Sequence, residues 1–282
     1  MEPAEPAEPA PPTLSRRHEA GAPSARGMLL TLLGEFVNPG DGMAWTSAVL
    51  TVFERLGVAE KAARQALMRT SNAGLLQPEK IGRRTRWQLT PAAKKLLTDG
   101  AERIYSFGPA DDWDGQWVLV AVRIPESDRR ARHVVRSRLA WAGFGSLGPG
   151  LWISPHSGRE HEAVKVLREA GAGDDANVFV ARRTGLSDTR DMVAAAWDLP
   201  AIEAEYEQFL AEFGGKPPQD VLATQLELVH AWRRFPSLDP ALPRKLLPAR
   251  WSGTKAAELF AGRHEQWLTD SRREWKRLNS QS

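Results

Sequence analysis

One predicted helix, residues 59–73, carries side chains that could bind the edges of DNA base pairs. A rotation of about 100° per residue places small residues on one face of this helix and polar or flexible residues on the other. The second set is Lys61, Arg64, Gln65, Met68 and Asn72, with Arg69 at its boundary. Arginine can bond N7 and O6 of guanine, glutamine can bond adenine, and methionine can contact the methyl group of thymine. The pattern predicts a DNA-recognition helix, although a solvated charged face is the ordinary interpretation of one isolated helix.

A cationic turn follows this helix and favours the DNA interpretation. Residues 75–77 and 85–89 are predicted to form two short strands joined by Ile81-Gly82-Arg83-Arg84. The basic residues of this hairpin are Lys80, Arg83, Arg84 and Arg86. Arginines on a hairpin tip contribute little to packing, whereas beside a duplex they can reach phosphates or the minor groove. We therefore expect the hairpin to contact DNA next to the helix.

The distribution of charge along the chain agrees with a DNA-binding N-terminal segment. The 282 residues carry a net charge of only +3, but residues 26–98 hold 11 Lys and Arg against 5 Asp and Glu. Residues 111–183 hold 11 against 10, and residues 184–282 hold 13 against 14. Positive charge therefore gathers in the segment that contains the predicted recognition helix.

The composition excludes several classes of protein. Cysteine is absent, which removes disulfides, thiolate catalysis and cysteine zinc sites, and agrees with a reducing compartment. No apolar run approaches the roughly 18 residues that a membrane span needs. Residues 1–25, with their repeated Glu-Pro-Ala pattern, lack the features of a signal peptide and are expected to be a disordered tail. We expect a cytoplasmic protein with no membrane partner.

The segment that carries the basic residues is predicted to fold as a winged helix-turn-helix. Apolar residues recur at helical spacing over residues 26–37 and again after Thr46 and Ser47, which offer a hydroxyl N-cap. Three helices followed by a hairpin make this motif. Thr90-Pro91 then begins a further helix, which leads out through Gly100.

The rest of the chain is predicted to form a mixed middle part and a helical end. Strands and helices are expected to alternate as β-α-β-α-β over residues 117–122, 127–142, 150–154, 158–170 and 177–181. This order is typical of a ferredoxin-like domain, in which the glycines of residues 143–150 serve turns. Later helices are expected at residues 193–197, 202–213, 219–235 and 254–278, with a proline-rich loop at 239–251. The fold class is α+β, with a tail (1–25), a winged helix-turn-helix domain (26–99), a linker (100–112), a ferredoxin-like domain (113–185) and a helical domain (186–282).

Catalytic and metal-binding interpretations have little support. The six histidines form no His-x-x-x-His pair, and the closest two, His156 and His161, flank a predicted loop. Ser154-Pro155-His156 and the acidic run Asp111-Asp112-Trp113-Asp114 fit no nucleophile elbow or ligand spacing. A phosphate-binding Gly-x-x-x-x-Gly-Lys sequence does not occur. We predict no catalytic residue, no metal site and no cofactor.

A small-molecule site is the remaining candidate for binding chemistry. Many of the 11 tryptophans lie outside the predicted DNA-binding segment. Indole rings suit an aryl group, and cations suit phosphate groups. The candidate ligand-binding residues are Arg138, Trp141, Trp152, His230 and Arg233. Core packing of the tryptophans and ion pairing of the arginines explain the same residues equally well.

Several motifs occur in order along the chain. They are Leu30-Thr31-Leu32-Leu33-Gly34-Glu35, Ala63-Arg64-Gln65-Ala66-Leu67-Met68-Arg69, Gly82-Arg83-Arg84, Trp113-Asp114-Gly115-Gln116-Trp117, Gly143-Phe144-Gly145, Gly150-Leu151-Trp152-Ile153-Ser154-Pro155, Trp197-Asp198-Leu199 and the proline-leucine pattern of residues 239–248. Together they resemble the PaaX family, bacterial repressors of phenylacetic acid degradation, and the resemblance covers nearly everything after the tail. So many ordered matches are hard to reach by chance.

The resemblance implies a winged helix domain, a central domain similar to the CRISPR-associated Cas2 fold and a helical C-terminal domain. It further implies a homodimer on an inverted repeat of double-stranded operator DNA, released by an aryl-CoA thioester such as phenylacetyl-CoA. Cas2-type nucleases carry a metal-binding aspartate at the end of their first strand, where this sequence has Val122-Arg123. Nuclease activity is therefore not expected, and the resemblance predicts a sequence-specific repressor of a phenylacetate-type catabolic operon.

Three other hypotheses remain open. An enzyme that acts on acyl-CoA or nucleic acid has its only support in His230-Ala231-Trp232-Arg233-Arg234, and turnover of an acyl-CoA would favour it. A paralogous regulator would respond to a different inducer. An adaptor with a vestigial winged helix would show no salt-dependent DNA affinity.

Overall fold

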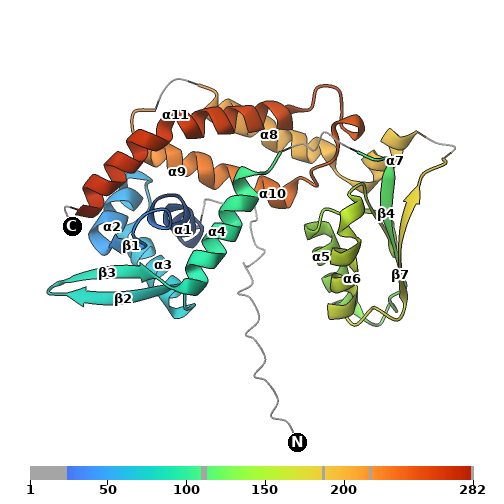
Figure 1. The fold of residues 1–282 in the computed structure, drawn as a ribbon, viewed down its shortest axis with the longest axis horizontal. Helices are drawn as coiled ribbons and strands as arrows, with labels where there is room; N and C mark the ends of the chain where they lie inside the picture. Colours follow the sequence, from blue (N-terminus) through green and yellow to red (C-terminus); the bar gives the residue numbers. More distant parts are fainter. Residues whose placement is uncertain (1–23, 109–112, 186–187, 216–217, 281–282) are drawn as a thin grey trace, which may run out of the picture. The chain divides into compact units, whose positions relative to one another are not determined.

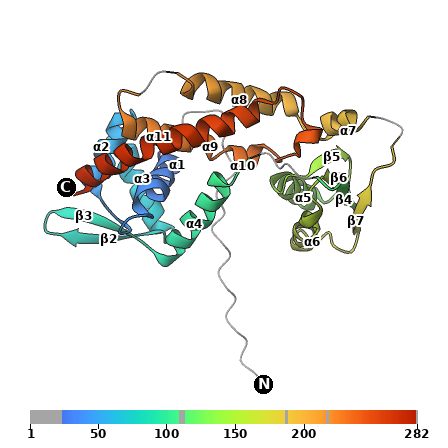
Figure 2. The same cartoon turned by 45° about the horizontal axis from the view of Figure 1, so that its top comes forward.

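The structure is a computed structural model that describes residues 24–108, 113–185, 188–215 and 218–280. It divides into two compact units, residues 1–100 with 270–282 and residues 101–269. Figures 1 and 2 show the helices and strands of each unit. Most of the expected tail and the acidic pair Asp111-Asp112 lie outside the described residues. Within the described ranges, no helix is long and apolar enough to cross a membrane, and no cluster of three or more His, Asp or Glu side chains is placed to hold a metal ion.

The first unit begins with three helices, as predicted. They are α1 (Ala25–Leu32, continued by a π-helical turn at Leu33–Val37), α2 (Thr46–Arg55) and α3 (Glu60–Asn72). Their apolar faces bury Leu29, Val49, Phe53 and Leu67 at 1% exposure or less. The apolar residues that recur at helical spacing in the sequence therefore pack together in one core shared by the three helices.

The predicted N-cap of α2 is wrong. Trp45 occupies the cap position and makes no side-chain capping bond. The hydroxyl of Thr46 instead donates to the carbonyl of Thr85 at 2.9 Å and accepts from Nε1 of Trp87, also at 2.9 Å. Thr46 therefore fastens the hairpin to α2 rather than capping the helix.

The hairpin is longer than predicted and is part of a three-stranded sheet. β2 (Leu76–Ile81) and β3 (Arg84–Leu89) pair in antiparallel register, with Ile81 opposite Arg84. Gly82 in the turn has a φ of +62°, a conformation that suits glycine. A third strand, β1 (Met43–Trp45), pairs with β3 and was not predicted, because three residues are too few to show a period.

Two long helices cross the division between the units. α4 (Pro91–Tyr105) begins where Thr90-Pro91 predicted, with the Thr90 hydroxyl accepting the N–H of Ala93 at 3.1 Å. It continues past Gly100, so the first part of the expected linker is helical. α11 (Ser252–Ser280) is close to its predicted extent, but its residues from 270 onward belong to the first unit.

A four-stranded antiparallel sheet forms one side of the second unit. β4 (Gln116–Val122), β5 (Gly145–Gly148), β6 (Leu151–Ser154) and β7 (Ala176–Arg182) lie in the order β5-β6-β4-β7. Helices α5 (Arg129–Trp141) and α6 (Glu160–Glu169) complete the order β-α-β-β-α-β of ferredoxin-like folds. The predicted class is therefore correct, although one strand was missed.

The missed strand is β5, where the sequence predicted only turns. Its glycines hid the pattern, because glycine has no side chain to mark a buried face. A Cβ on Gly145 would lie 2.5 Å from the ring of Trp197, so glycine here lets the indole pack against the strand.

The two faces of this sheet are covered by different helices. Val118 and Val120 face α5 and α6 with Val135 and Leu139. On the opposite face, Trp117 joins a larger aromatic core. That core is built by α7 (Thr189–Ala196), α8 (Leu199–Phe213), α9 (Val221–Trp232), α10 (Phe235–Leu238) and α11.

Candidate nucleic-acid interface

Helix α3 presents the predicted recognition residues to solvent. Ala63, Ala66, Leu67 and Thr70 are buried, and the Thr70 hydroxyl donates to the carbonyl of Ala66 at 2.8 Å. The opposite face is exposed at every predicted position: Lys61, Arg64, Gln65, Met68, Arg69 and Asn72. The packing of α3 therefore leaves this whole face available to a partner.

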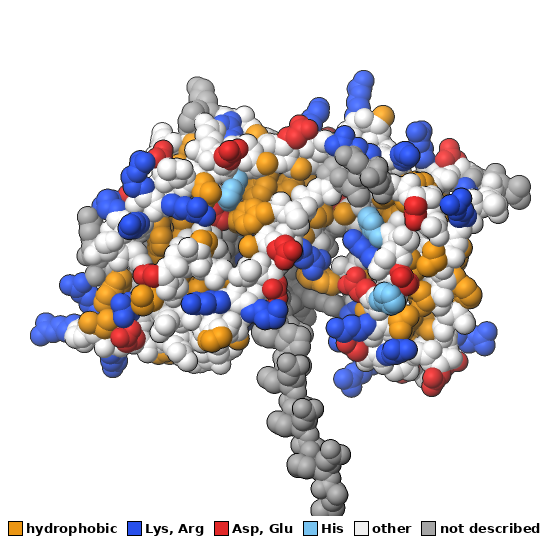
Figure 3. All heavy atoms as spheres, viewed as in Figure 1, with side chains coloured by type: hydrophobic (Ala, Val, Ile, Leu, Met, Phe, Trp, Pro, Cys, Tyr) orange, Lys and Arg blue, Asp and Glu red, His pale blue; other side chains and the backbone are white. Residues whose placement is uncertain are grey.

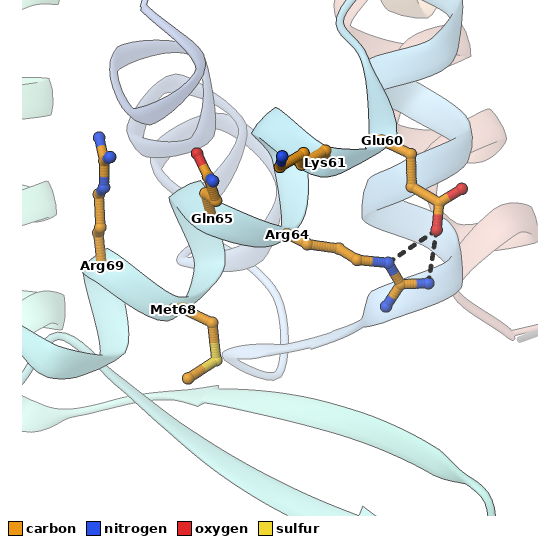
Figure 4. A pocket seen from close by; sticks show the side chains of 6 residues that line it. All are labelled: Glu60, Lys61, Arg64, Gln65, Met68 and Arg69. Carbon is orange, nitrogen blue, oxygen red and sulfur yellow. Dashed lines mark hydrogen bonds and ion pairs between the residues drawn. The ribbon is translucent and has the colours of Figure 1, made fainter.

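All of these side chains except Asn72, together with Glu60, line a broad surface concavity of about 690 Å³. Figure 4 shows Lys61, Gln65 and Arg69 projecting from successive turns of α3, with Met68 on the side of the hairpin. Met68 is 53% exposed and is one of the large apolar side chains on the surface of the described chain. An exposed thioether amid cationic and amide groups has the chemistry of a base-edge contact to thymine.

Glu60 is a member of this surface that the sequence reasoning missed. Its Oε1 accepts from Nε and Nη2 of Arg64, each at 2.7 Å (Figure 4). Both side chains are more than half exposed, so the pair contributes at most about 1 kcal/mol and exchanges readily. The i,i+4 spacing of an acid and a base was the signal that could have found it.

The basic residues of the hairpin fall into two groups. Lys80 and Arg83 are exposed at its outer end, where Figure 3 shows Lys and Arg side chains on the surface. Arg84 and Arg86 lie over the ring of Trp45 in β1, with guanidinium carbons 6.0 and 5.7 Å from its centroid. Lys80 and Arg83 are exposed and can reach a partner, whereas Arg84 and Arg86 are oriented by an aromatic platform.

Arg86 is held by a second contact as well. Its Nη2 lies 2.8 Å from Oε2 of Glu79 on the neighbouring strand. Glu79 and Arg86 are directly opposite in the β2–β3 register, which is the arrangement that favours cross-strand pairs. Arg86 therefore stiffens the hairpin in addition to carrying charge.

The C-terminal end of α11 contacts β1, the strand that carries Trp45. The side chain of Asn279 accepts the N–H of Trp45 at 2.9 Å and donates to the carbonyl of Met43 at 3.0 Å. The rings of Phe36 and Trp275 stack with centroids 6.2 Å apart. The platform below Arg84 and Arg86 thus depends on residues far away in sequence, which no local pattern predicts.

Glu274 on the same stretch of α11 joins two arginines. Its Oε1 lies 2.9 Å from Arg55 of α2 and 2.7 Å from Arg277. The hydrogen bonds from Arg277 and Arg55 lower the pKa of the Glu274 carboxyl from 4.5 to about 2. The carboxylate is therefore charged throughout the neutral range and ties α11 to α2.

The five predicted ligand-binding residues lie in different surroundings within the second unit. Arg138 pairs with Glu169 of α6, and Trp152 is buried between the sheet and α5. Trp141 is 40% exposed, with the guanidinium carbon of Arg103 4.9 Å from its ring centroid. His230 and Arg233 lie at the end of α9, where burial lowers the pKa of Arg233.

Arg103 contacts both Trp141 and the chain segment that follows α9. Its Nη2 donates to the carbonyl of Pro236 at 2.9 Å while its guanidinium covers Trp141. Trp141 therefore lies near the chain segment that follows Arg233, whereas Arg138 and Trp152 make other contacts. Within the described residues, the structure shows no direct contact between two members of the predicted set, and Trp141 instead contacts Arg103, a residue that the sequence did not single out.

An aromatic cluster surrounds a buried acid in the second unit. The hydroxyl of Tyr206 donates to Oδ2 of Asp239 at 2.7 Å, and the N–H of Ala241 donates to Oδ1 at 2.7 Å. Burial raises the pKa of Asp239. The cavity here has about 10 Å³ of space, enough for no more than one water molecule. An aryl group would have to displace side chains to enter it.

Comparisons with known proteins agree with the motifs in the sequence. Three family models match, described as PaaX-like protein at residues 24–93, PaaX protein central Cas2-like domain at residues 110–193 and PaaX-like protein C-terminal domain at residues 197–277. A curated relative, the transcriptional repressor PaaX of Escherichia coli strain K12, is 32% identical over 254 residues, which are 84% of this chain and 78% of that protein.

A solved structure shares the fold. The uncharacterized protein Rv0674 of Mycobacterium tuberculosis has a TM-score of 0.62 and is 21% identical, with 90% of this chain and 98% of that chain covered. At this identity the likeness concerns the fold alone.

Proposed function

The chain belongs to the PaaX family, and from this premise we propose that it is a transcriptional repressor that binds operator DNA through helix α3. The observation that carries the proposal is the uninterrupted exposed face of α3, with Met68 53% exposed among cationic and amide side chains. Helices α1–α3 and the β2–β3 hairpin follow one another in the order of a winged helix-turn-helix. In that motif the last of the three helices enters the major groove.

Each side chain of this face has a proposed role. Arg64 forms a bidentate contact with a guanine, Gln65 bonds an adenine, and Met68 contacts a thymine methyl group. Lys61, Arg69 and Asn72 lie along the same face and contact the backbone or neighbouring bases. Glu60 releases Arg64 when the guanidinium turns to the base, at little cost because both groups are solvated.

The hairpin acts as the wing. Lys80 and Arg83 at its outer end contact phosphates or enter the minor groove. Arg84 and Arg86, oriented by Trp45, contact the phosphate backbone. Contacts of this kind strengthen binding to any duplex and do not select a sequence.

A homodimer on an inverted repeat is part of the same proposal. Two recognition helices related by a two-fold axis enter successive major grooves about 34–36 Å apart. In this proposal the predicted winged helix-turn-helix domain, residues 26–99, binds DNA. The other predicted parts are a tail (1–25), a linker (100–112), a Cas2-like domain (113–185) and a helical domain (186–282). We assign no catalytic role to the chain and place its action in the cytoplasm, where the DNA lies.

We further propose that an aryl-CoA thioester such as phenylacetyl-CoA releases the repressor from a phenylacetate-type operon. The support is the name of the curated relative's family together with the cations and indoles of the second unit. Arg138, Trp141, Trp152, His230 and Arg233 are the proposed contacts. The space of about 10 Å³ beside Tyr206 and Trp232 is lined by none of these five residues and is too small for an aryl group, so it is not the proposed ligand site.

Fluorescence anisotropy tests these claims together. The full chain is titrated onto duplexes that carry inverted repeats from its neighbouring operons and onto random duplex, at several salt concentrations, with phenylacetyl-CoA, acetyl-CoA or no addition. If the chain binds the inverted repeats selectively and only phenylacetyl-CoA abolishes this binding, both the proposed repressor function and the proposed effector are supported. Selective binding unaffected by the thioester supports the repressor and rejects this effector, and equal binding to all duplexes rejects the repressor.

A further inference from the structure

Helix α5 concentrates positive charge in a part of the chain whose total charge is balanced. Residues 123–141 hold 6 Lys and Arg against 2 Asp and Glu, whereas the rest of residues 111–183 hold 5 against 8. Figure 3 shows Lys and Arg side chains on the surface where Figure 1 places α5 and α6. The near-neutral total of this segment therefore conceals a local basic surface.

Four side chains on one face of α5 form this surface. Residues at spacings of three, four and seven lie on the same face of a helix. The opposite face buries Val135 and Leu139 beneath the sheet, so it is already occupied. Arg130 is exposed at the edge of the surface. The four exposed members, which we call the α5 basic face, are Arg129, Arg132, His133 and Arg136.

Most of the arginines of α5 are not neutralised by the fold. Arg138 pairs with Glu169, and Nη2 of Arg132 donates to the backbone carbonyl of Glu126. An arginine side chain stays protonated in proteins, so each of the others presents a full positive charge to solvent. The arginines of α5 that make no hydrogen bond or ion pair with any residue that the structure describes are Arg129, Arg130 and Arg136.

The positions of these arginines are unfavourable for the helix itself. Arg129 and Arg130 begin α5, whose first turn contains no acidic residue. Backbone N–H groups give the start of a helix a partial positive charge, so cations there are destabilising, and like charges three or four residues apart repel. The nearby Asp128 is engaged as the N-cap and accepts the N–H of Ala131 at 2.8 Å. An anionic partner would relieve this repulsion, because the arginines and the start of the helix both attract anions.

The spacing of the cations fits the phosphate backbone of a duplex. Arg129 and Arg136 are seven residues apart, which is about 10 Å along a helix. One strand of B-DNA advances about 3.4 Å for each phosphate, so the face can meet about three phosphates. No Phe, Tyr or Trp lies between these arginines, whereas surfaces for single strands use such rings for stacking. The buried apolar face also prevents α5 from lying in a lipid surface.

We propose that the α5 basic face is a second DNA-binding surface, which contacts the phosphate backbone of the duplex that α3 reads. Contacts to phosphates raise affinity and leave the choice of sequence to other residues. The Cas2-like part of the chain thereby adds to the strength of DNA binding. The inference rests on the proposed function for the presence of DNA and adds a contact outside α3 and the hairpin.

The salt dependence of binding tests this surface. The full chain with Arg129→Gln, Arg130→Gln and Arg136→Gln together is titrated onto the operator duplex by anisotropy. The slope of log K against log salt should fall by about 2–3, and the affinity at low salt should fall at least about tenfold, as for the loss of two or three phosphate contacts. An unchanged slope would overturn the proposal.

A second triple variant removes the same charge elsewhere in the second unit. Lys245→Gln, Arg250→Gln and Lys255→Gln replace three exposed cations of the proline-rich loop and the start of α11. This control should keep the wild-type slope to within about 0.5. Equal losses in the two triple variants would show that only net charge matters, and would reject a specific surface on α5.

Thermal unfolding separates a binding role from a structural one. Because cations at the start of a helix are destabilising, the α5 triple variant should unfold at the wild-type temperature or above it. A lower unfolding temperature would show that the arginines support the fold, and the loss of affinity would then not indicate a DNA contact. A changed mass in sedimentation with unchanged DNA binding would assign the face to a contact between chains and overturn the proposal.

Photocrosslinking locates the contact directly, because the chain has no cysteine of its own. Ala140 is exposed on the side of α5 that carries the basic face, and Ala249 is exposed in the proline-rich loop. Ala140→Cys, labelled with an azidophenacyl probe, should crosslink to the operator duplex, and labelled Ala249→Cys should not. Crosslinking from Ala249→Cys but not from Ala140→Cys would contradict the proposed surface.

The same titrations distinguish this inference from the proposed function. If wild type binds the operator selectively and the α5 triple variant binds as wild type does, the surface is wrong and the repressor stands. If wild type binds every duplex equally and the α5 triple variant binds all of them more weakly, the surface stands and the proposed function fails.

Discussion

The side chain of Asn279 bridges α11 to β1 through the N–H of Trp45, at 2.9 Å, and the carbonyl of Met43, at 3.0 Å. Trp45 in turn supports Arg84 and Arg86 of the hairpin. A residue near the end of the described chain thereby positions two basic side chains of the proposed DNA surface.

Asn279→Ala should weaken both the first unit and DNA binding. Loss of one side-chain bond that satisfies a half-buried backbone N–H costs about 1–3 kcal/mol of unfolding free energy. Because the platform for two wing arginines loosens, affinity should fall on operator and random duplex alike. Urea denaturation and anisotropy measure the two effects, with exposed Lys276→Ala as the stability control. Wild-type stability of Asn279→Ala would contradict the bridge.

Glu274 should make the stability of the first unit depend on acid pH. Its pKa is lowered in the fold from 4.5 to about 2 by Arg277 and Arg55, so its contribution is complete above about pH 4.5 and is lost as the pH falls toward 2. Because the group is partly exposed, the contribution is about 1 kcal/mol or less. Thermal unfolding of Glu274→Gln should therefore differ from wild type at pH 6 and converge with it near pH 2. Asp270→Asn, which removes an exposed pair with Arg273, should show a smaller difference.

The exposed face of α3 could be predicted from the sequence because its cause is local. A period of 3.6 residues separates Ala63, Ala66 and Leu67 from Arg64, Gln65 and Met68, and burial of the first set orients the second. The turn between β2 and β3 and the start of α4 follow from turn and capping residues in the same way, whereas β2 extends four residues beyond its predicted end.

What the sequence could not show depends on contacts between distant residues. Asn279 reaches β1 across more than two hundred residues, and the N-cap prediction at Thr46 failed because Trp87 and Thr85 compete for the same hydroxyl. β5 was missed because Gly145 has no side chain that would mark a buried face, and Trp197 occupies the space where such a side chain would lie. Arg103 gives no local signal, since its role depends on Trp141 and Pro236.

Arg64 should determine preference at one base pair. Arg64→Ala should cost about 1–3 kcal/mol on the operator and relax selectivity at a single position, with a smaller loss on random duplex. Arg64→Lys is the matched control, because it keeps the charge and cannot form the bidentate contact, so it should retain affinity for random duplex and lose selectivity. Affinities for a set of operators with single base changes measure both. Equal losses on operator and random duplex for Arg64→Ala would refute the base contact.

Arg84 should contribute affinity without selectivity. Arg84→Ala should weaken binding to every duplex by the same factor and reduce the slope of log K against log salt by about 1, as expected for one lost phosphate contact. Anisotropy titrations at four salt concentrations give this slope. A loss confined to the operator would instead assign Arg84 to base recognition.

Tyr206 should stabilise the second unit through the buried Asp239. Tyr206→Phe removes a donor from the carboxylate and should lower the unfolding free energy by about 1–3 kcal/mol. Burial already raises the pKa of Asp239, so the folded chain takes up a proton at higher pH than the unfolded chain, and the penalty on charged Asp239 is relieved as the pH falls. The difference between Tyr206→Phe and wild type should therefore shrink on acidification through that pKa. The chain has one other tyrosine, and exposed Tyr105→Phe is the matched control that should change stability much less. A deficit that stays constant down to the unfolded pKa of Asp239 would show that lost packing, and not the hydrogen bond to Asp239, explains the effect.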